Sequence, residues 1–268
     1  MHNENEFRAV RPVRPAAGYV GGKRQLAATI IEKIEATEHT LYAEAFVGMG
    51  GVFLRRSAAP KIEVINDRSK DVATFFRVLQ RHYQAFMDML KWQLTSRAEF
   101  ERLKATDPET LTDLERAARF LYLQRLAFGG KVAGRNFGVQ TTGPARFDTR
   151  KLGVLLEAIH ERLAGVTIEC LDWREFLARW DRPGALFFLD PPYLGTENMY
   201  GKGLFPPADH RALAAVLKRL KGRFILTMND TKEARAIYGV FDVETADLSY
   251  SLAGGDQRKA VREIIVSR

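Results

Sequence analysis

Leu186-Phe187-Phe188-Leu189-Asp190-Pro191-Pro192-Tyr193 joins a short apolar run to an acid, two prolines and a tyrosine. Four consecutive apolar residues before a turn predict a buried strand of a parallel sheet. Because proline cannot donate to the sheet ladder and keeps the preceding residue extended, we expect the strand to end before Asp190. Asp190 would then lie at the carboxyl end of a strand, the edge where open α/β sheets bind ligands.

Residues 190–193 also suit a flat ligand that carries an amino group. Carboxylate and peptide oxygens accept hydrogen bonds from an amino group, and the Tyr193 ring can stack on the face of the ligand. The two prolines restrict the backbone that carries these groups. A purely structural interpretation stays open at this point, namely a strand followed by a Pro-Pro turn with a half-buried tyrosine.

Length and composition indicate an ordinary soluble globular protein. The chain has 268 residues, 46% hydrophobic and 28% charged, which is enough for one large domain with or without an insertion. We see no apolar run of membrane-spanning length and no charged-then-apolar leader. The single cysteine, Cys170, excludes an intramolecular disulfide and fits a reducing cytoplasm. We expect Cys170 to be a buried thiol on a strand rather than a nucleophile.

The net charge of +8 favours a polyanionic partner, although a solvated basic surface is the alternative. The distribution of the charge is more informative than its sum, because several basic clusters lie outside regular helices, where phosphate contacts are common. Three such clusters comprise Arg8, Arg11 and Arg14; Lys131, Arg135, Arg146, Arg150 and Lys151; and Arg258, Lys259 and Arg262, whereas Arg116, Arg119 and Arg125 lie on an expected helix.

Strand and helix patterns alternate along most of the chain, which predicts a doubly wound, mainly parallel sheet. We expect strands at 41–46, 62–65, 166–170, 185–189, 223–228, 241–243 and 261–266. We expect helices at 23–35, 51–57, 72–79, 82–94, 97–104, 111–128, 152–163, 173–179, 208–220 and 231–238. The domain assignment is an N-terminal arm over 1–18, a core domain over 19–75 and 151–268, and a helical insert over 76–150.

A glycine-rich turn follows the first long strand, in Glu44-Ala45-Phe46-Val47-Gly48-Met49-Gly50-Gly51. Glycines let a backbone approach a cofactor closely, but a packing turn is the simpler interpretation. Asp67 ends the next strand, at about the spacing where an acid binds ribose hydroxyls. Because the dinucleotide fingerprint is incomplete, a nucleoside cofactor fits better. S-adenosylmethionine qualifies, with a ribose, an amine for Glu44 and a sulfonium beside Phe46.

Two further motifs carry candidate site residues. Tyr19-Val20-Gly21-Gly22-Lys23-Arg24 presents an aromatic ring and a cation on a Gly-Gly turn, without the glycine spacing of a Walker motif. Asp172, in Leu171-Asp172-Trp173, is placed either to cap a helix or to serve as a pocket acid.

In this order, the motifs resemble those of the Dam-like (D12 class) adenine-specific DNA methyltransferases. The resemblance covers nearly the whole chain from Tyr19 and includes Phe224–Asp230 and the turn Tyr250–Gly254. It implies a Rossmann-like methyltransferase sheet, mostly parallel with an antiparallel strand at the C-terminal end, and a helical target-recognition insert. It also implies methyl transfer from S-adenosylmethionine to N6 of a flipped adenine in duplex DNA, in the cytoplasm of a bacterium or phage-infected host.

The resemblance also implies roles for individual residues. The catalytic set is Asp190, Pro191, Pro192 and Tyr193; Asp190 and the Pro191 carbonyl accept from the adenine amino group, and Tyr193 stacks on the ring. The cofactor-binding set, with the pocket-acid alternative for Asp172 included, is Tyr19, Lys23, Glu44, Phe46, Gly48, Gly50, Asp67, Asp172 and Asp190. We expect Arg125, Lys131, Arg135 and Asn136 to contact DNA, and we expect no metal.

The chain departs from the family pattern at three places. Met49 stands where a small residue is common, Tyr19 replaces the common tryptophan, and Tyr122–Gly130 lacks the usual Asn-Arg-x-Cys-Phe-Asn-Gly motif. The last difference lies where DNA contacts are expected, so the recognition sequence does not carry over and GATC is only a default. Cytosine-N4 or RNA methylation, a catalytically inactive DNA-binding relative and, less favoured, a nicotinamide dehydrogenase are the alternatives. A partner restriction endonuclease is compatible with the motifs.

Overall fold

The computed structural model describes residues 7–139, 146–196, 199, 203–251 and 258–268. Seven of its strands form the central sheet, in the order β5 (Thr167–Glu169), β4 (Ile62–Asn66), β2 (Leu41–Glu44), β6 (Ala185–Leu189), β7 (Arg223–Asn229), β9 (Arg258–Ser267) and β8 (Asp242–Ser251). Strands β5 to β7 are parallel, whereas β9 runs antiparallel between β7 and β8. The expected mostly parallel sheet with an antiparallel C-terminal end is therefore confirmed.

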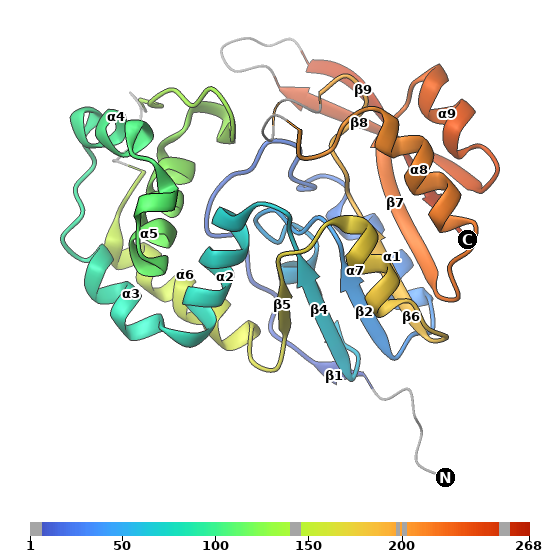
Figure 1. Ribbon diagram of the computed structural model, residues 1–268, viewed down its shortest axis with the longest axis horizontal. Helices are drawn as coiled ribbons and strands as arrows, with labels where there is room; N and C mark the ends of the chain where they lie inside the picture. The colour runs from blue at the N-terminus through green and yellow to red at the C-terminus, as the bar shows by residue number, and fades with distance from the viewer. Residues whose placement is uncertain (1–6, 140–145, 197–198, 200–202, 252–257) are drawn as a thin grey trace.

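Helices cover both faces of this sheet (Figure 1). On one face the core includes residues of α1 (Ala27–Ala36), α2 (Lys70–Arg81) and α6 (Thr149–Arg162). On the other it includes α7 (Trp173–Trp180), α8 (Ala208–Leu217) and α9 (Lys232–Tyr238). Strand β6 serves both cores, because successive side chains of a strand point to opposite faces. Leu186 and Phe188 pack on the first face, and Phe187 and Leu189 on the second.

The helical insert stands beside the sheet and consists of α3 (Tyr83–Leu90), α4 (Arg97–Ala105), the short 3-10 helix η2 (Pro108–Thr110) and α5 (Asp113–Leu126) (Figure 1). A reciprocal capping box between Thr112 and Glu115 starts α5. Phe86, Phe100 and Phe120 from the insert join the core cluster that contains Phe75 of α2. The insert therefore packs on the sheet domain through a shared core.

The N-terminal segment is pinned to the body of the protein. Strand β1 (Arg8–Ala9) pairs antiparallel with β3 (Ala58–Ala59), and the Val13 amide donates to the Leu54 carbonyl. Val13 is also buried. The described part of the predicted arm is thus held to the body of the protein at β1 and at Val13.

Four local expectations need correction or fall outside the description. The helix expected at 51–57 is only the 3-10 turn η1 (Phe53–Arg55), because Arg56 turns into extended backbone and inserts its guanidinium beside Glu63. The last two strands are longer than expected and form a hairpin. Cys170 is exposed, not buried, because it follows the edge strand β5. Of the expected turn Tyr250–Gly254, residues 252–254 lie outside the described residues.

Candidate active site at the carboxyl edge of the sheet

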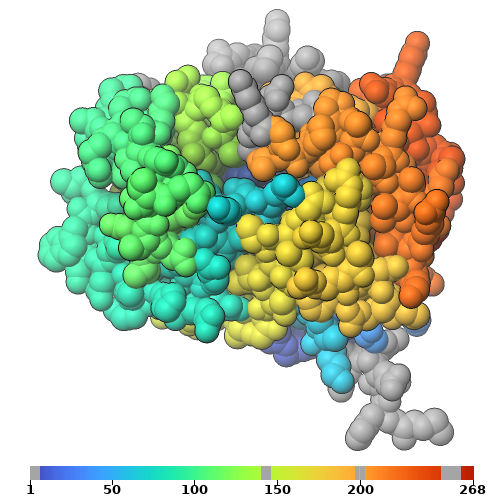
Figure 2. Space-filling model, in the orientation of Figure 1, coloured from blue at the N-terminus to red at the C-terminus, as the bar shows by residue number. Residues whose placement is uncertain are grey.

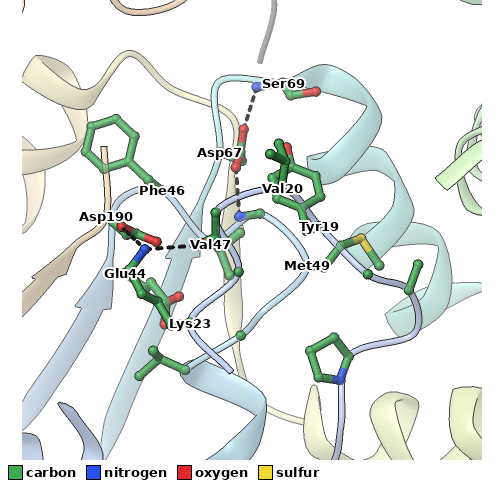
Figure 3. Close-up of a pocket in the computed structure, with 18 of the residues that line it drawn as sticks. Tyr19, Val20, Lys23, Glu44, Phe46, Val47, Met49, Asp67, Ser69 and Asp190 are labelled. Carbon is green, nitrogen blue, oxygen red and sulfur yellow. Dashed lines mark hydrogen bonds and ion pairs between the residues drawn. The ribbon is translucent and has the colours of Figure 1, made fainter. Parts of the chain in front are cut away.

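A cavity of about 650 Å³ opens where β2, β4 and β6 end (Figure 3). The strand order reverses between β2 and β6, which is the position where open α/β sheets bind ligands. Nine of the expected site residues line the cavity: Tyr19, Lys23, Glu44, Phe46, Gly48, Asp67, Arg125, Asp190 and Pro192. The surface is also hollowed between the insert and the α7–α8 side of the sheet domain (Figure 2).

Asp190 follows the last residue of β6, as expected from the prolines after it. Its Oδ1 lies 2.7 Å from Lys23 Nζ and accepts a hydrogen bond of 2.8 Å from Thr227 Oγ1. Burial raises the pKa of Asp190, whereas the Lys23 charge and the two hydrogen-bond donors lower it. In the described part of the chain both contacts fall on Oδ1, so Oδ2 is available to a ligand.

Tyr193 is fixed at its backbone and at its hydroxyl. The amide and the hydroxyl of Thr196 both donate to the Tyr193 carbonyl, which closes a tight turn. The Tyr193 hydroxyl donates to the carboxylate of Glu263 on β9. Lys23 Nζ lies 4.6 Å from the centre of the Tyr193 ring, in a cation–π contact. Lys23 therefore touches both the acid and the ring of the Asp190–Tyr193 loop.

Asp67 holds the glycine turn in place. Its Oδ2 accepts from the Gly48 amide at 2.9 Å and its Oδ1 from the Ser69 amide at 2.8 Å. Burial raises the pKa of Asp67 to about 6, against the effect of these two donors. Gly48 has φ +51°, and a Cβ there would lie 3.0 Å from the Tyr19 ring. Only glycine lets Tyr19 pack this closely against the turn.

Glu44 is the most deeply buried acid of the cavity, with 2% of its surface exposed. The Tyr42 hydroxyl donates to its Oε2 at 2.8 Å. Burial raises the pKa of Glu44 to about 8; the nearby Asp190 charge adds to the rise, and the Tyr42 hydrogen bond opposes it. Such a carboxyl group favours a ligand that brings a positive charge, because the cation compensates the cost of ionising it.

Two residues of the predicted cofactor set have structural roles. Asp172 caps α7 by accepting from the Arg174 amide and pairs with Arg68 at 2.6 Å. Of the two interpretations left open for Asp172, the structure therefore supports the helix cap, and it does not line the cavity. Gly50 has φ +75° and packs against Leu54, so it shapes the turn without lining the cavity.

The four residues expected to contact DNA divide into two pairs. Lys131 and Asn136 are exposed, next to the turn η3 (Phe128–Gly130). Arg125 is directed inward and donates to the carbonyls of Ala16 and Arg146. Arg135 is only 9% exposed and donates to Gln124 Oε1 and the Lys131 carbonyl. These contacts support the loop from inside; Arg135 is buried, whereas Arg125 also lines the cavity.

Sequence reasoning missed Thr227, Phe205 and Glu263. Phe205 lines the cavity and packs edge-on against Phe46, with ring centres 5.6 Å apart. Thr227 and Glu263 are polar residues that adjoin apolar residues of their strands, and this was the one signal that could have found them. Buried polar residues need partners, and here the partners are the residues of the Asp190–Tyr193 loop.

Neither a metal-binding cluster nor a membrane-spanning helix occurs among the described residues. No group of three or more histidine, cysteine, aspartate or glutamate side chains is arranged to hold a metal ion there. Within the same residues, no helix combines the length and the apolar character needed to cross a membrane.

Known proteins resemble this chain over most of its length. The Type II methyltransferase M1.LlaDCHI of Lactococcus lactis subsp. cremoris is 24% identical over 273 residues, which is 95% of each chain. The Type II methyltransferase M.CviBI of Paramecium bursaria Chlorella virus NC1A is 22% identical, over 84% of this chain and 86% of that one. The DNA N-6-adenine-methyltransferase of Escherichia phage P1 is 26% identical, over 71% of this chain but only 26% of that protein.

The family profile covers the cavity and the insert together. Residues 19–251 match the profile of the D12 class N6 adenine-specific DNA methyltransferases, which spans the Tyr19–Lys23 loop, the glycine turn and the Asp190–Tyr193 loop. The chain therefore belongs to the D12 class N6 adenine-specific DNA methyltransferase family.

Proposed function

We propose that the cavity binds S-adenosylmethionine and that the Asp190–Tyr193 loop presents an adenine amino group, from a base flipped out of duplex DNA, to its methyl group. The observation that carries this proposal is the convergence of Glu44, Asp67 and Asp190 on one cavity with Lys23. When bound, the cofactor supplies an electrophilic methyl group. All remaining steps depend on how this chain's own residues bind and orient the two substrates.

The cavity residues fit the parts of such a cofactor. Glu44 is a buried acid suited to a positively charged amine, and Asp67 stands at the end of β4, where an acid binds ribose hydroxyls. The rings of Phe46 and Phe205 suit a sulfonium, because an aromatic face attracts positive charge. Tyr19, packed on Gly48, offers an aromatic surface for a base.

The Asp190–Tyr193 loop fits the chemistry of the second substrate. The lone pair of an adenine amino nitrogen is delocalised into the ring, so this nitrogen is a poor nucleophile. Oδ2 of Asp190 and the Pro191 carbonyl would accept one hydrogen bond each from the two N–H groups of this nitrogen. These two hydrogen bonds favour a pyramidal nitrogen whose lone pair is directed at the methyl group. As positive charge develops on the nitrogen, the Asp190 carboxylate stabilises it and is the nearest base for the departing proton.

The target nitrogen is out of reach inside a duplex, so the base must be flipped into the cavity. Lys131 and Asn136 are exposed in the loop that follows α5, and we assign the DNA contact of this loop to them. Arg14 and Arg24 are exposed where they line the cavity and are suited to the phosphates of a flipped nucleotide. Arg125 and Arg135 hold the loop from inside.

Product analysis tests this proposal directly. The purified protein is incubated with S-adenosylmethionine labelled in the methyl group and with unmethylated duplex DNA, and the DNA is digested to nucleosides. We expect the label in N6-methyldeoxyadenosine. Label in N4-methyldeoxycytidine, label only when RNA replaces DNA, or no label at all would overturn the proposal; these outcomes correspond to the cytosine-N4, RNA and inactive alternatives.

We also propose that methylation is directed to one short sequence, and that a restriction endonuclease specific for the same sequence is a partner. The names of two relatives, both Type II methyltransferases, support this proposal. Mapping N6-methyladenine in the DNA of an expressing host identifies the sequence, with GATC as the default. Methylation spread evenly over all adenines would contradict the sequence-specific part of the proposal.

A further inference from the structure

Three polar side chains of β7 and β9 hold the Asp190–Tyr193 loop from the neighbouring strands. Thr227 donates to Asp190, and Asn229 Nδ2 donates to the Leu194 carbonyl at 3.1 Å. Glu263, which pairs in register with Asn229, accepts from the Tyr193 hydroxyl. Each of these side chains stands in a strand whose other residues are mostly apolar. The loop is therefore held at its acid, at its turn and at its aromatic ring.

Glu263 is the most unusual member of this group. It is only 3% exposed and lies next to Ile264, Ile265 and Val266. A carboxylate is costly to bury unless it is hydrogen-bonded, and the Tyr193 hydroxyl, 70 positions away in the chain, supplies such a bond. A carboxylate in this position is explained by its partner rather than by the packing of the strand.

We propose that Glu263 is a positioning residue for methyl transfer, which sets the tilt of the Tyr193 ring and so the face on which the target base stacks. The inference rests on the proposed function, because it takes the Tyr193 ring as the platform for adenine. The backbone of Tyr193 is already fixed by its turn with Thr196, so the ring torsions are the freedom that remains. A hydrogen bond at the hydroxyl, the atom of the side chain farthest from Cα, restrains where the ring lies. Because this oxygen is on the ring axis, rotation about that axis is restrained only by the in-plane preference of the phenol O–H.

The same hydrogen bond also affects the electrons of the ring. A phenol that donates to a carboxylate carries more negative charge on its ring, and this strengthens attraction to a cation on its face. Lys23 Nζ lies on that ring, 4.6 Å from its centre, so the face is already used by a positive group. During transfer the opposite face would meet a base whose amino nitrogen becomes positive. Small errors in its orientation slow a reaction that depends on alignment.

Four variants test this proposal: Glu263→Met, Glu263→Gln, Tyr193→Phe and the double variant Tyr193→Phe/Glu263→Met. The measurements are the single-turnover transfer rate at saturating cofactor and DNA, and the affinity for cofactor by calorimetry. We expect Glu263→Met and Tyr193→Phe each to slow transfer by about 10-fold or more while cofactor affinity stays within about twofold of wild type. Glu263→Gln, which still accepts from the hydroxyl, should keep at least about a third of the rate.

The double variant distinguishes positioning from simple structural damage. If Glu263 acts through Tyr193, the double variant is no slower than the slower single variant. The proposal is overturned if the double variant shows the product of the two single rate losses. It is also overturned if Glu263→Gln is as slow as Glu263→Met. Should Glu263→Met not fold, Tyr193→Phe and Glu263→Gln still decide, because a full rate in Tyr193→Phe is equally contradictory.

The controls separate this inference from the proposed function. Glu244→Met is a matched change on the neighbouring strand β8, where the side chain is 58% exposed, and it should leave the transfer rate unchanged. A wild-type protein that transfers no methyl group to DNA refutes the proposed function. A wild-type protein that is active, with multiplying losses in the double variant, refutes only the role of Glu263.

Discussion

Lys23 Nζ lies 2.7 Å from Asp190 Oδ1 and 4.6 Å from the centre of the Tyr193 ring. The ammonium group thus contacts the same acid and the same ring that an adenine amino group would use. The Lys23 side chain is 4% exposed and also donates to the Gly21 carbonyl at 2.8 Å, which anchors it to the N-terminal loop. Through this contact the N-terminal loop supplies a charge that lowers the pKa of Asp190, against the larger effect of burial, which raises it.

Replacement of Lys23 by methionine should therefore change the pH dependence of activity. Burial raises the pKa of Asp190 and Lys23 lowers it, so loss of the ammonium raises that pKa further. At a given pH less of the carboxylate is ionised, and we expect the acid limb of the kcat/KM profile to move to higher pH. Lys61→Met, at an exposed position, is the matched control. An acid limb that stays in place would contradict this role of Lys23.

Glu44 should make the protein without cofactor less stable as the pH rises. Burial raises its folded-state pKa from 4.5 to about 8, so the native state binds the proton more tightly than the unfolded state. The free energy of unfolding therefore falls as the pH rises from about 4.5 to about 8. One group contributes at most about 1.4 kcal/mol per pH unit to this slope. Glu44→Gln should remove this slope.

Urea unfolding at pH 6.5 and pH 8 measures this difference, because the pKa of Asp67 is about 6 and Asp67 contributes less in that range. Glu32→Gln, at an exposed position of α1, controls for the change of charge. Cofactor binding at pH 7 should also release a proton from Glu44, seen as a dependence of the calorimetric enthalpy on the buffer. If the free energy of unfolding depends on pH equally in wild type and in Glu44→Gln, then Glu44 is already ionised in the native state over this range, and the prediction is wrong.

Gly48→Ala should weaken cofactor binding by displacing Tyr19. The added Cβ would lie 3.0 Å from the Tyr19 ring, and φ +51° strains any other residue. Gly165→Ala is the matched control, since it has φ +76° with open space around it. We expect both variants to lose about 1–2 kcal/mol of stability, and only Gly48→Ala to lose about 10-fold or more in cofactor affinity. Equal affinities in the two variants would remove Tyr19 from the proposed site.

In the loop that follows α5, replacement of the exposed Lys131 should affect DNA binding, whereas replacement of the buried Arg135 should affect stability. Lys131→Ala should weaken DNA binding and reduce the slope of log K against log salt by about 1, as expected for the loss of one phosphate contact. Arg135→Met should instead lower the melting temperature, because Arg135 is buried and bonded to Gln124. Lys221→Ala, beside the amino end of β7 and away from the cavity, is the control. An unchanged salt slope in Lys131→Ala would exclude this contact.

The sequence predicted those parts of the site that depend on local chain direction. A proline after an apolar run places Asp190 at a strand end wherever the strand lies in the sheet. Asp67 was placed in the same way, as the acid that follows the short strand β4. Both acids line the cavity. The helices with strong apolar periodicity, such as α6 and α7, were also predicted close to their observed bounds.

The remaining features depend on contacts between distant segments. Glu263 meets Tyr193 only because β9 is inserted antiparallel between β7 and β8. Local sequence patterns do not predict this strand order. Arg125 and Arg135 look like surface cations in sequence, but Arg125 bonds the Ala16 carbonyl of the N-terminal segment and Arg135 bonds the Gln124 amide oxygen of α5. The position of a long basic side chain is decided by such partners, which composition does not reveal.

The rate of methyl transfer by Asp190→Ala tests the central claim most directly. With labelled S-adenosylmethionine and unmethylated duplex DNA both saturating, a single-turnover experiment measures the step in which we propose that the Asp190 carboxylate accepts from the adenine amino group. We predict that wild type places label in N6-methyldeoxyadenosine and that Asp190→Ala is slower by about 1000-fold or more. An Asp190→Ala variant that keeps more than about a tenth of the wild-type rate would contradict the account.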